Sequence, residues 1–320
     1  MARRLRYFTP GSLVEITVRT VQGRMLLSPS LRVNRLILGS LGRAQRLFGM
    51  SIHGYVFLSN HYHLLLSPES PHQLANFMNH LNSRLAREIG RIRGWGGSLW
   101  ARRYQSIEVS HEEAAQVARF RYLLSHGCKE GLVERPEQWP GAHCSTALAL
   151  GQSPAGFWLD RTALYRATRR GRVLCPQTCT SLERVELSPL PCWQSLSAAE
   201  YRERVGEIVN EVVEVHRKER LSLGRKVLGR TKVLSQDPRT RCRRPSTRPS
   251  PVVHAIVPAV RHQLQTAYRE FVLVFKAASI RFRAGDRAAV FPPWSFPPAL
   301  PPVPGQHPGS PSSRQVSNSC

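Results

Sequence analysis

Long apolar runs are missing from this 320-residue sequence. No window comes near the roughly 18 consecutive apolar residues that a membrane-spanning helix needs. The first twelve residues, MARRLRYFTPGS, also lack the apolar core of a secretory signal peptide. We therefore expect a cytoplasmic protein without a membrane partner.

Acidic residues and lysine are scarce. The chain has 21 Asp and Glu against 46 Lys and Arg, which gives a formal net charge of +25. Only 5 of the cationic residues are Lys and 41 are Arg, whose planar forks bind phosphate oxygens in a bidentate way. This balance predicts a polyanionic partner, with nucleic acid ahead of an acidic membrane surface.

Cysteine occurs in an odd number and without regular spacing. Seven residues in a chain of this size do not form the paired pattern of a disulfide framework. Cys175 and Cys179 form a CxxxC pair, but no second pair at zinc-ligand spacing accompanies it. We therefore favour reduced thiols over a structural zinc site.

Hydrophobic periodicity predicts a small α+β fold in the first half of the chain. Residues 12–21 alternate apolar and polar side chains, which is typical of a half-buried strand. Two β-rich runs with Asn60 between them predict a tight hairpin, and Ser110 with Glu113 resembles a capping box. The expected strands are 12–21, 51–59, 61–66 and 99–109, and the expected helices are 30–48, 73–89 and 110–127. This order fits a ferredoxin-like α+β sandwich, an antiparallel sheet with helices on one face.

The second half of the chain is more basic and less regular. Residues 151–320 carry +15 of the net charge. The expected division is a first domain at 1–150, a basic and mainly helical region at 151–290 with helices at 198–219 and 259–283, and a Pro- and Ser-rich disordered tail at 291–320. The Arg-rich stretch 239–248 is either an extra nucleic-acid contact or a solvated loop that aids solubility.

His61 and His63 flank Tyr62 on the second strand of the predicted hairpin. Alternate strand residues share a face, so the two imidazoles could bind one cation while Tyr62 packs on the opposite face. Such a pair alone is more often structural than metal-binding. On the third predicted helix, Tyr122 and His126 lie four residues apart and share a face. A Tyr hydroxyl beside a three-ligand metal site suits covalent phosphoryl chemistry.

Two motifs, in order along the chain, resemble those of the REP-associated tyrosine transposases, which belong to the single-tyrosine HUH, or IS200-like, group. NHYHLLL at 60–66 is similar to the His-hydrophobic-His motif of that family. RYLLSHGCKEGLVERPEQWPG at 121–141 is similar to its Tyr-bearing helix and the run that follows. The resemblance covers about the first 145 residues and implies a ferredoxin-like domain that carries an extra catalytic helix.

This resemblance implies a metal-dependent transposase that cleaves single-stranded, hairpin-associated DNA and holds the new 5′ end as a phosphotyrosine. Tyr122 would be the nucleophile, and His61, His63 and His126 would ligate Mg²⁺ or Mn²⁺. The chain departs from the family pattern where His126 and Gly127 replace an amide ligand and a proline. A softer nitrogen ligand at 126 favours Mn²⁺ or weakens the use of Mg²⁺.

These departures keep a second class of function open. The alternative is a catalytically inactive protein on the same fold that binds DNA or RNA hairpins. An RRM-like RNA-binding protein is disfavoured, because the central strands carry no RNP-like aromatic run with Lys/Arg-Gly-Phe.

A surface for single-stranded DNA is expected where cations and aromatic rings alternate, because phosphates need the first and bases the second. Each basic run alone is more often a solvated face. Tyr104 ranks as a DNA-stacking or packing residue, and His53 as a structural residue rather than a ligand. The expected DNA-binding residues are Arg3, Arg4, Arg6, Arg84, Arg87, Arg91, Arg93, Arg102, Arg103 and Tyr104.

The expected partner is single-stranded or hairpin DNA, which would associate the protein with the nucleoid. The sequence is compatible with a monomer and with a homodimer. In a dimer with a swapped helix Tyr122 would act in trans, and the same site residues are predicted for both arrangements.

Overall fold

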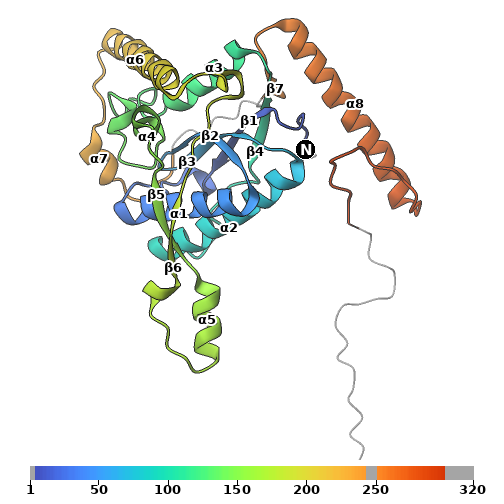
Figure 1. The fold of residues 1–320 in the computed structure, drawn as a ribbon, viewed down its shortest axis with the longest axis horizontal. Coiled ribbons are helices and arrows are strands. Elements are labelled where there is room, and N and C mark those ends of the chain that lie inside the picture. Colours follow the sequence, from blue (N-terminus) through green and yellow to red (C-terminus); the bar gives the residue numbers. More distant parts are fainter. Residues whose placement is uncertain (1–3, 243–250, 300–320) are drawn as a thin grey trace, which may run out of the picture.

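A computed structural model of the protein describes residues 4–242 and 251–299 (Figure 1). The strands are β1 (Leu13–Arg19), β2 (Ser51–Phe57), β3 (His61–Ser67), β4 (Gln105–Val109), β5 (Ala155–Leu159), β6 (Thr180–Arg184) and β7 (Val253–His254). The α-helices are α1 (Leu31–Phe48), α2 (Pro71–Arg93), α3 (Glu113–Leu124), α4 (Ser145–Leu150), α5 (Arg161–Arg169), α6 (Ala198–Ser222), α7 (Arg230–Leu234) and α8 (Pro258–Arg283).

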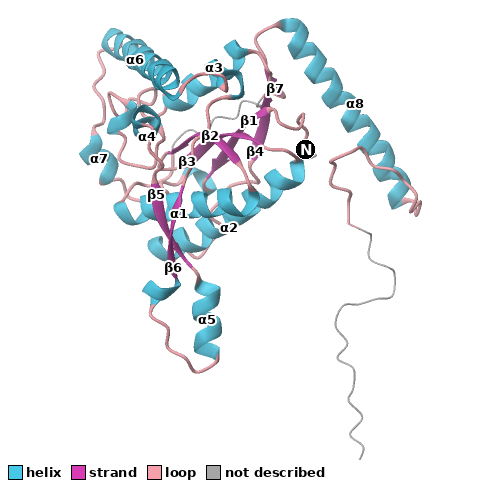
Figure 2. Ribbon diagram, viewed as in Figure 1, coloured by secondary structure: helices cyan, strands magenta, loops and turns pink. Residues whose placement is uncertain are grey.

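A five-stranded sheet with the order β2-β3-β1-β4-β7 lies at the centre of the molecule (Figure 2). The first four strands pair in antiparallel fashion, and their β-α-β-β-α-β order along the chain is that of a ferredoxin-like fold. The predicted fold class is therefore confirmed. The fifth strand, β7, comes from the far end of the chain and pairs with β4 in parallel.

The two faces of the sheet have different covers. Tyr62 of β3 is fully buried on the face of α1 and α2, where its hydroxyl donates a hydrogen bond to Asn82 and its ring stacks on Phe57. His61 and His63 point to the other face, which α3 covers with α6 beside it (Figure 1). The strand alternation predicted for this motif is confirmed, and Tyr62 packs in the core.

Local signals at the ends explain why α1 and α2 form where they do. The hydroxyls of Ser30 and Ser70 accept hydrogen bonds from backbone N–H groups in the first turn of each helix. Gly49 and Gly94 end the helices in the left-handed conformation, which glycine adopts without strain.

The expected start of the third helix is wrong. Its first residue is Glu113, and the Ser110 side chain makes no capping bond to it. The reason is tertiary, because the Ser110 N–H donates to the His254 carbonyl of β7 and so prolongs the sheet.

The second half of the chain returns to the first at several places. The hairpin β5–β6 with α5 forms an arm (residues 155–184) that docks on α1 and projects below the sheet in Figure 1. Helix α6 packs against α3 and α4, while the rings of Tyr268 and Phe271 on α8 contact Tyr7. The Arg-rich stretch is described only up to residue 242. Residues 239–242 form backbone hydrogen bonds with residues 23–25, so this part is not the fully solvated loop that was one of the two expectations.

No helix in 4–242 or 251–299 is both long and apolar enough to cross a membrane. Within the predicted tail, residues 291–299 contain no helix or strand, and 300–320 lie outside the described residues.

Candidate active site

Three imidazoles converge between β3 and the end of α3. His61 and His63 extend from β3, and His126 follows the last turn of α3. The ring centroids of His63 and His126 lie 4.4 Å apart. The centroid of His61 lies 5.3 Å from that of His63 and 5.7 Å from that of His126. Potential ligand atoms of all three lie within 4.8 Å of one another, the only such cluster of three or more His, Cys, Asp or Glu among the described residues. The histidine site (His61, His63 and His126) unites the three residues expected from the sequence.

Each imidazole of the histidine site meets an oxygen acceptor at Nδ1. The pairs are His61 with Asn60 Oδ1 at 2.6 Å, His63 with Glu15 Oε1 at 3.2 Å and His126 with Glu130 Oε1 at 2.9 Å. Thr17 Oγ1 also lies 3.1 Å from His63 Nδ1. An acceptor at Nδ1 favours the tautomer that carries its proton there and leaves Nε2 free as a ligand. His126 Nε2 is buried and has no hydrogen-bond partner. The donor set therefore fits a divalent cation held by three Nε2 atoms.

Ionisation at the histidine site also suits a metal. Burial lowers the pKa of His63 to about 4. Burial also lowers the pKa of His61 well below its usual range, with help from the two neighbouring imidazoles. Desolvation raises the pKa of Glu130, but its bonds to His126 and to the Gly127 N–H outweigh this and lower it to about 2. Neutral imidazoles backed by an ionised carboxylate are the forms that metal binding requires.

Tyr122 lies on the last turn of α3 with its ring against the histidine site. Its centroid is 4.8 Å from that of His126 and 5.7 Å from that of His63. The Arg119 guanidinium and the Lys129 ammonium lie 4.1 and 4.0 Å from the centre of the Tyr122 ring. Cations in this position can stabilise the oxygens of a phosphate bound beside the ring. One chain is sufficient to bring all these groups together.

The residues that depart from the family pattern form a compact loop. Gly127 has φ of 94°, a left-handed conformation that favours glycine. Its N–H donates to Glu130 Oε2 at 2.7 Å, while His126 Nδ1 donates to Oε1 of the same carboxylate. The pair His126-Gly127 is thus fixed by Glu130, which holds the third imidazole toward the other two.

Two carboxylates of the site were not predicted from the sequence. Glu130 lies four residues after His126, a spacing from which a contact could have been expected. Glu15 lies on β1, next to β3, and its contact with His63 depends on the strand register, which the sequence does not disclose.

The residues expected to bind DNA differ in their exposure to solvent. Those exposed to solvent are Arg4, Arg87, Arg91, Arg102 and Arg103, and Arg6 and Arg93 are half-buried. Arg84 is buried, donates to the Leu159 carbonyl and lies over the Trp158 ring. Tyr104 is only 8% exposed and the Arg6 guanidinium lies 4.2 Å from its ring centre.

Arg84 and Tyr104 are therefore held within the protein, because Trp158 of the arm and the amino-terminal segment cover them. Arg93 also turns inward, to the carbonyls of Leu26 and Ser28. Arg3 lies outside the described residues. His53 is buried and contacts Ser67 and the Ser188 and Pro189 carbonyls, which agrees with a structural role.

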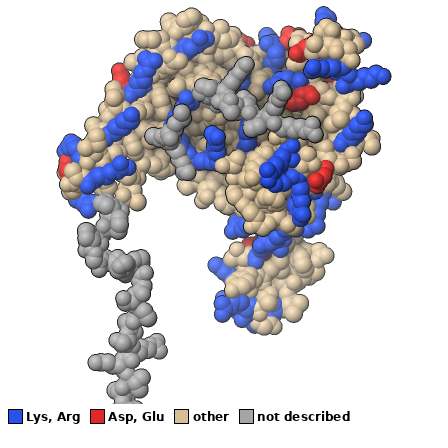
Figure 3. Space-filling model, turned by 180° about the vertical axis from the view of Figure 1, so that it is seen from behind, with Lys and Arg blue, Asp and Glu red and all other residues tan. Residues whose placement is uncertain are grey.

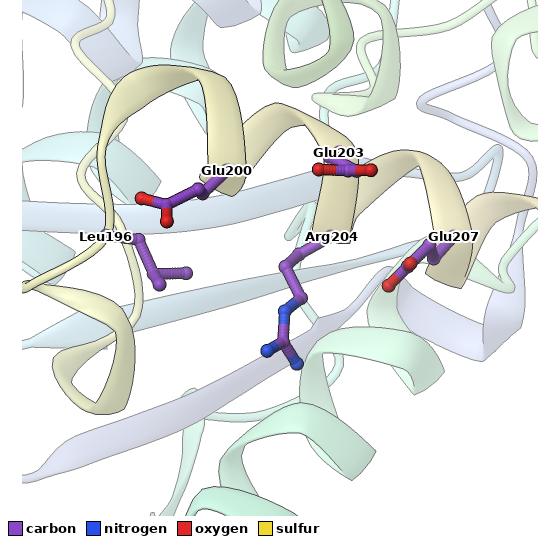
Figure 4. Close-up of a pocket in the computed structure, with 5 residues that line it drawn as sticks. All are labelled: Leu196, Glu200, Glu203, Arg204 and Glu207. Carbon is purple, nitrogen blue, oxygen red and sulfur yellow. The ribbon is translucent and has the colours of Figure 1, made fainter.

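A cavity of about 170 Å³ lies between the loop after α3 and the end of α6, and Lys129, which lies over the Tyr122 ring, is part of its lining. Its lining has four cationic residues, Lys129, Arg220, Arg225 and Lys226, against two acidic ones, Glu130 and Glu219. Arg220 Nη1 is buried without a hydrogen-bond partner. A second cavity, of about 390 Å³, is acidic, with Glu200, Glu203 and Glu207 on successive turns of α6 (Figure 4). Only the basic cavity suits a phosphate.

The family model described as "Transposase IS200 like" matches residues 32–122, a segment that holds His61, His63 and Tyr122. Among curated proteins no sequence is found to match the chain. The match confirms the resemblance predicted from the motifs. Over residues 32–122 the chain is therefore similar to the IS200-like transposases.

Two solved structures are similar to the chain. One is a REP-associated tyrosine transposase bound to a REP hairpin, 18% identical with a TM-score of 0.36, and the alignment covers 48% of this chain and 89% of that one. The other is a candidate transposase from Deinococcus radiodurans, 20% identical with a TM-score of 0.28, covering 37% and 95%. At TM-scores below 0.5 these likenesses carry neither a fold nor a function to this chain.

Proposed function

We propose that the protein is a metal-dependent transposase that cleaves single-stranded, hairpin-associated DNA through a 5′-phosphotyrosine on Tyr122. The observation that supports this most is the position of the Tyr122 ring against three imidazoles whose Nδ1 atoms are already engaged. A nucleophile beside a preformed cation site is what phosphoryl transfer to a side chain requires.

In the proposed reaction, Tyr122 loses its phenolic proton and its oxygen forms a bond to the phosphorus of one phosphodiester. The bond from phosphorus to the 3′ oxygen breaks, and that oxygen gains a proton to become a free 3′-hydroxyl. One phosphodiester replaces another, so no nucleoside triphosphate is needed. A 3′-hydroxyl that attacks the phosphotyrosine reverses these bond changes and rejoins a strand.

His61, His63 and His126 would hold Mg²⁺ or Mn²⁺, which when bound polarises the scissile phosphate. Arg119 and Lys129 would face the charge that develops on the phosphate oxygens, because both cations lie beside the phenol ring. The basic cavity next to Lys129 would accept a neighbouring phosphate of the strand. The exposed residues Arg87, Arg102 and Arg103 are proposed to add contacts to the backbone.

The test is a covalent-adduct assay with the full chain. The protein is incubated with labelled single-stranded hairpin DNA from the flanks of its own gene, with Mn²⁺ or Mg²⁺, and resolved on a denaturing gel. We expect a metal-dependent adduct that Tyr122→Phe abolishes. Tyr165→Phe, at an exposed tyrosine of the arm, is the matched control and should retain it.

The second candidate is the catalytically inactive hairpin-binding protein, which the replacement of an amide and a proline by His126 and Gly127 favours. Wild-type protein that binds the hairpin but forms no adduct with either metal would support this candidate and contradict the nuclease.

A further inference from the structure

The far end of the chain supplies a residue close to the histidine site. Strand β7 pairs with β4, with His254 in register with Val109. The Ser110 N–H donates to the His254 carbonyl at 2.9 Å, which fixes the backbone of this residue at the end of the sheet. The His254 imidazole reaches across to β1, where its Nε2 lies 3.0 Å from Glu15 Oε2.

Glu15 is the centre of this arrangement. It is 4% exposed and lies in the middle of β1, between β3 and β4. Its Oε1 lies 3.2 Å from His63 Nδ1 and accepts from Arg119 Nη2 at 3.1 Å, and its Oε2 lies 2.9 Å from Arg119 Nε. With His254, three partners therefore surround one buried carboxylate, which such a group requires to remain ionised.

The orientation of this carboxylate controls a metal ligand. His63 can offer Nε2 to a cation only while Nδ1 carries the proton. Glu15 Oε1 is the carboxylate acceptor that favours this tautomer, and Thr17 Oγ1 lies 3.1 Å from the same nitrogen. His254 lies against the other oxygen, with Nε2 at ion-pair distance from Oε2 but outside hydrogen-bond geometry, so it limits rotation of the carboxylate away from His63. Without His254, Arg119 is the remaining partner of Oε2, and Arg119 also lies over the Tyr122 ring.

We propose that His254 is a positioning residue for the metal site, acting through Glu15 on His63, so that the region after residue 150 completes a site built by the first 150 residues. The inference rests on the proposed function to the extent that the histidine site binds a divalent cation. It gives the C-terminal region a role in the chemistry in addition to its charge.

Metal affinity measured without DNA tests this inference. The full chain is titrated with Mn²⁺ by calorimetry, with free Mn²⁺ followed by electron paramagnetic resonance. Direct partners of metal-ligating histidines change metal affinity by about 10–100-fold. His254 acts one contact further out, through Glu15, so we expect His254→Ala to weaken Mn²⁺ binding by at most about tenfold. His254→Gln, whose amide can still donate to Glu15, should recover part of the loss. The matched control is His262→Ala, at an exposed histidine of α8, which should bind as wild type.

A second readout separates positioning from simple stability. Long-range ¹⁵N–¹H spectra report which ring nitrogen of His63 carries the proton, and His254→Ala should increase the Nε2–H tautomer in the metal-free protein. A variant with unchanged Mn²⁺ affinity and unchanged His63 tautomer, whatever its melting temperature, would overturn the inference and leave the proposed function standing. Wild-type protein that fails to bind Mn²⁺ would overturn both. If His254→Ala does not fold, His254→Gln against His262→Gln gives the same comparison.

Discussion

The Glu130 carboxylate accepts two hydrogen bonds, one from His126 Nδ1 and one from the Gly127 N–H. Its function follows from this geometry. One oxygen orients His126, the proposed third metal ligand, and the other holds the tight turn at Gly127, where the resembled family has a proline. The departure from the family pattern thus comes with a partner that compensates for it.

Truncation of Glu130 tests that reading at the level of one residue. Glu130→Ala removes the acceptor of His126, so we expect Mn²⁺ binding to weaken by about 10–100-fold. Glu130→Gln keeps an acceptor oxygen and should lose less. Glu134→Ala, at a largely exposed glutamate of the same loop, is the control. Calorimetric titration of the three variants measures the effect, and equal affinities for Ala and Gln would argue against an orienting role.

His53 leads to a prediction about pH. Burial lowers its pKa in the folded protein, despite carbonyl contacts that raise it, whereas an imidazole in the unfolded chain titrates near 6.5. Above about pH 6.5 neither state is protonated and the full contribution to stability is present. Below it the unfolded chain takes up a proton that the native protein does not, so stability falls with pH.

The measurement is urea unfolding between pH 7 and 5. His53→Gln cannot titrate, so its stability should fall less steeply with pH than that of wild type, by up to about 1.4 kcal/mol per pH unit. His262→Gln, at an exposed position, should follow the wild-type slope. If the free energy of unfolding falls with pH at the same rate in His53→Gln and in wild type, His53 is not held neutral in the folded protein.

At the level of elements, the arm docks on α1 through glycines that leave no room for a side chain. A Cβ at Gly39 would lie 2.3 Å from the Phe157 carbonyl oxygen, and one at Gly156 would lie 2.1 Å from the Arg35 oxygen. Gly42 faces the Arg184 carbonyl oxygen in the same way, at 2.4 Å. Since these are backbone atoms, only a shift of the whole hairpin can relieve such a contact.

Gly39→Ala should therefore separate the arm from α1. We expect faster limited proteolysis within 155–184 and a loss of about 1–3 kcal/mol in the free energy of unfolding, as for an overpacked contact. The control is Gly206→Ala on α6, where nothing lies within 4 Å of the added methyl. It should stabilise by about 0.5–1 kcal/mol, because Ala is the better helix former. Similar proteolysis of Gly39→Ala and wild type would contradict the docking.

Local pattern was sufficient to predict the elements that build the first half. β1, the strands of the hairpin β2–β3, α1 and α2 have a clear hydrophobic period, so the sheet and the HxH face could be predicted. The period of α3 is weak, and the shared face of Tyr122 and His126 was predicted from their spacing of four residues. β7 is two residues long and has no period, and its partner strand lies more than 140 residues earlier. For the same reason His254 and Glu15 could not be predicted, because their contact exists only once β7 is in place.

Burial of single side chains was also beyond the sequence. Tyr104 and Arg84 are of residue types that are common on DNA-binding surfaces. The amino-terminal segment covers Tyr104, and the arm covers Arg84. Whether such a side chain is buried depends on a segment that is distant in the sequence, and the residues around the side chain do not indicate that this segment will cover it.

On the scale of the whole molecule, positive charge is spread over the surface and is not confined to one strip. Figure 3 shows Lys and Arg widely distributed over one face, with few Asp and Glu among them. A net charge of +25 gives affinity for any polyanion, so we expect most of the DNA affinity to be independent of sequence and sensitive to salt.

A salt titration tests this view. For single strands the logarithm of the binding constant falls by about 0.7 per contacted phosphate for each tenfold rise in salt. If about five phosphates are contacted, raising salt from about 50 to 200 mM should weaken binding about a hundredfold. Fluorescence anisotropy with hairpin and scrambled strands measures both slopes. A slope near zero would mean that the charge does not contact the backbone.

The site of covalent attachment tests the central claim most directly. The full chain is reacted with hairpin DNA and Mn²⁺, digested with nuclease and protease, and the peptides are sequenced by mass spectrometry. We predict a 5′-phosphonucleotide on Tyr122 and none on Tyr62 or Tyr104. A nucleotide on any other residue, or its persistence in Tyr122→Phe, would contradict the assignment of Tyr122 as the nucleophile.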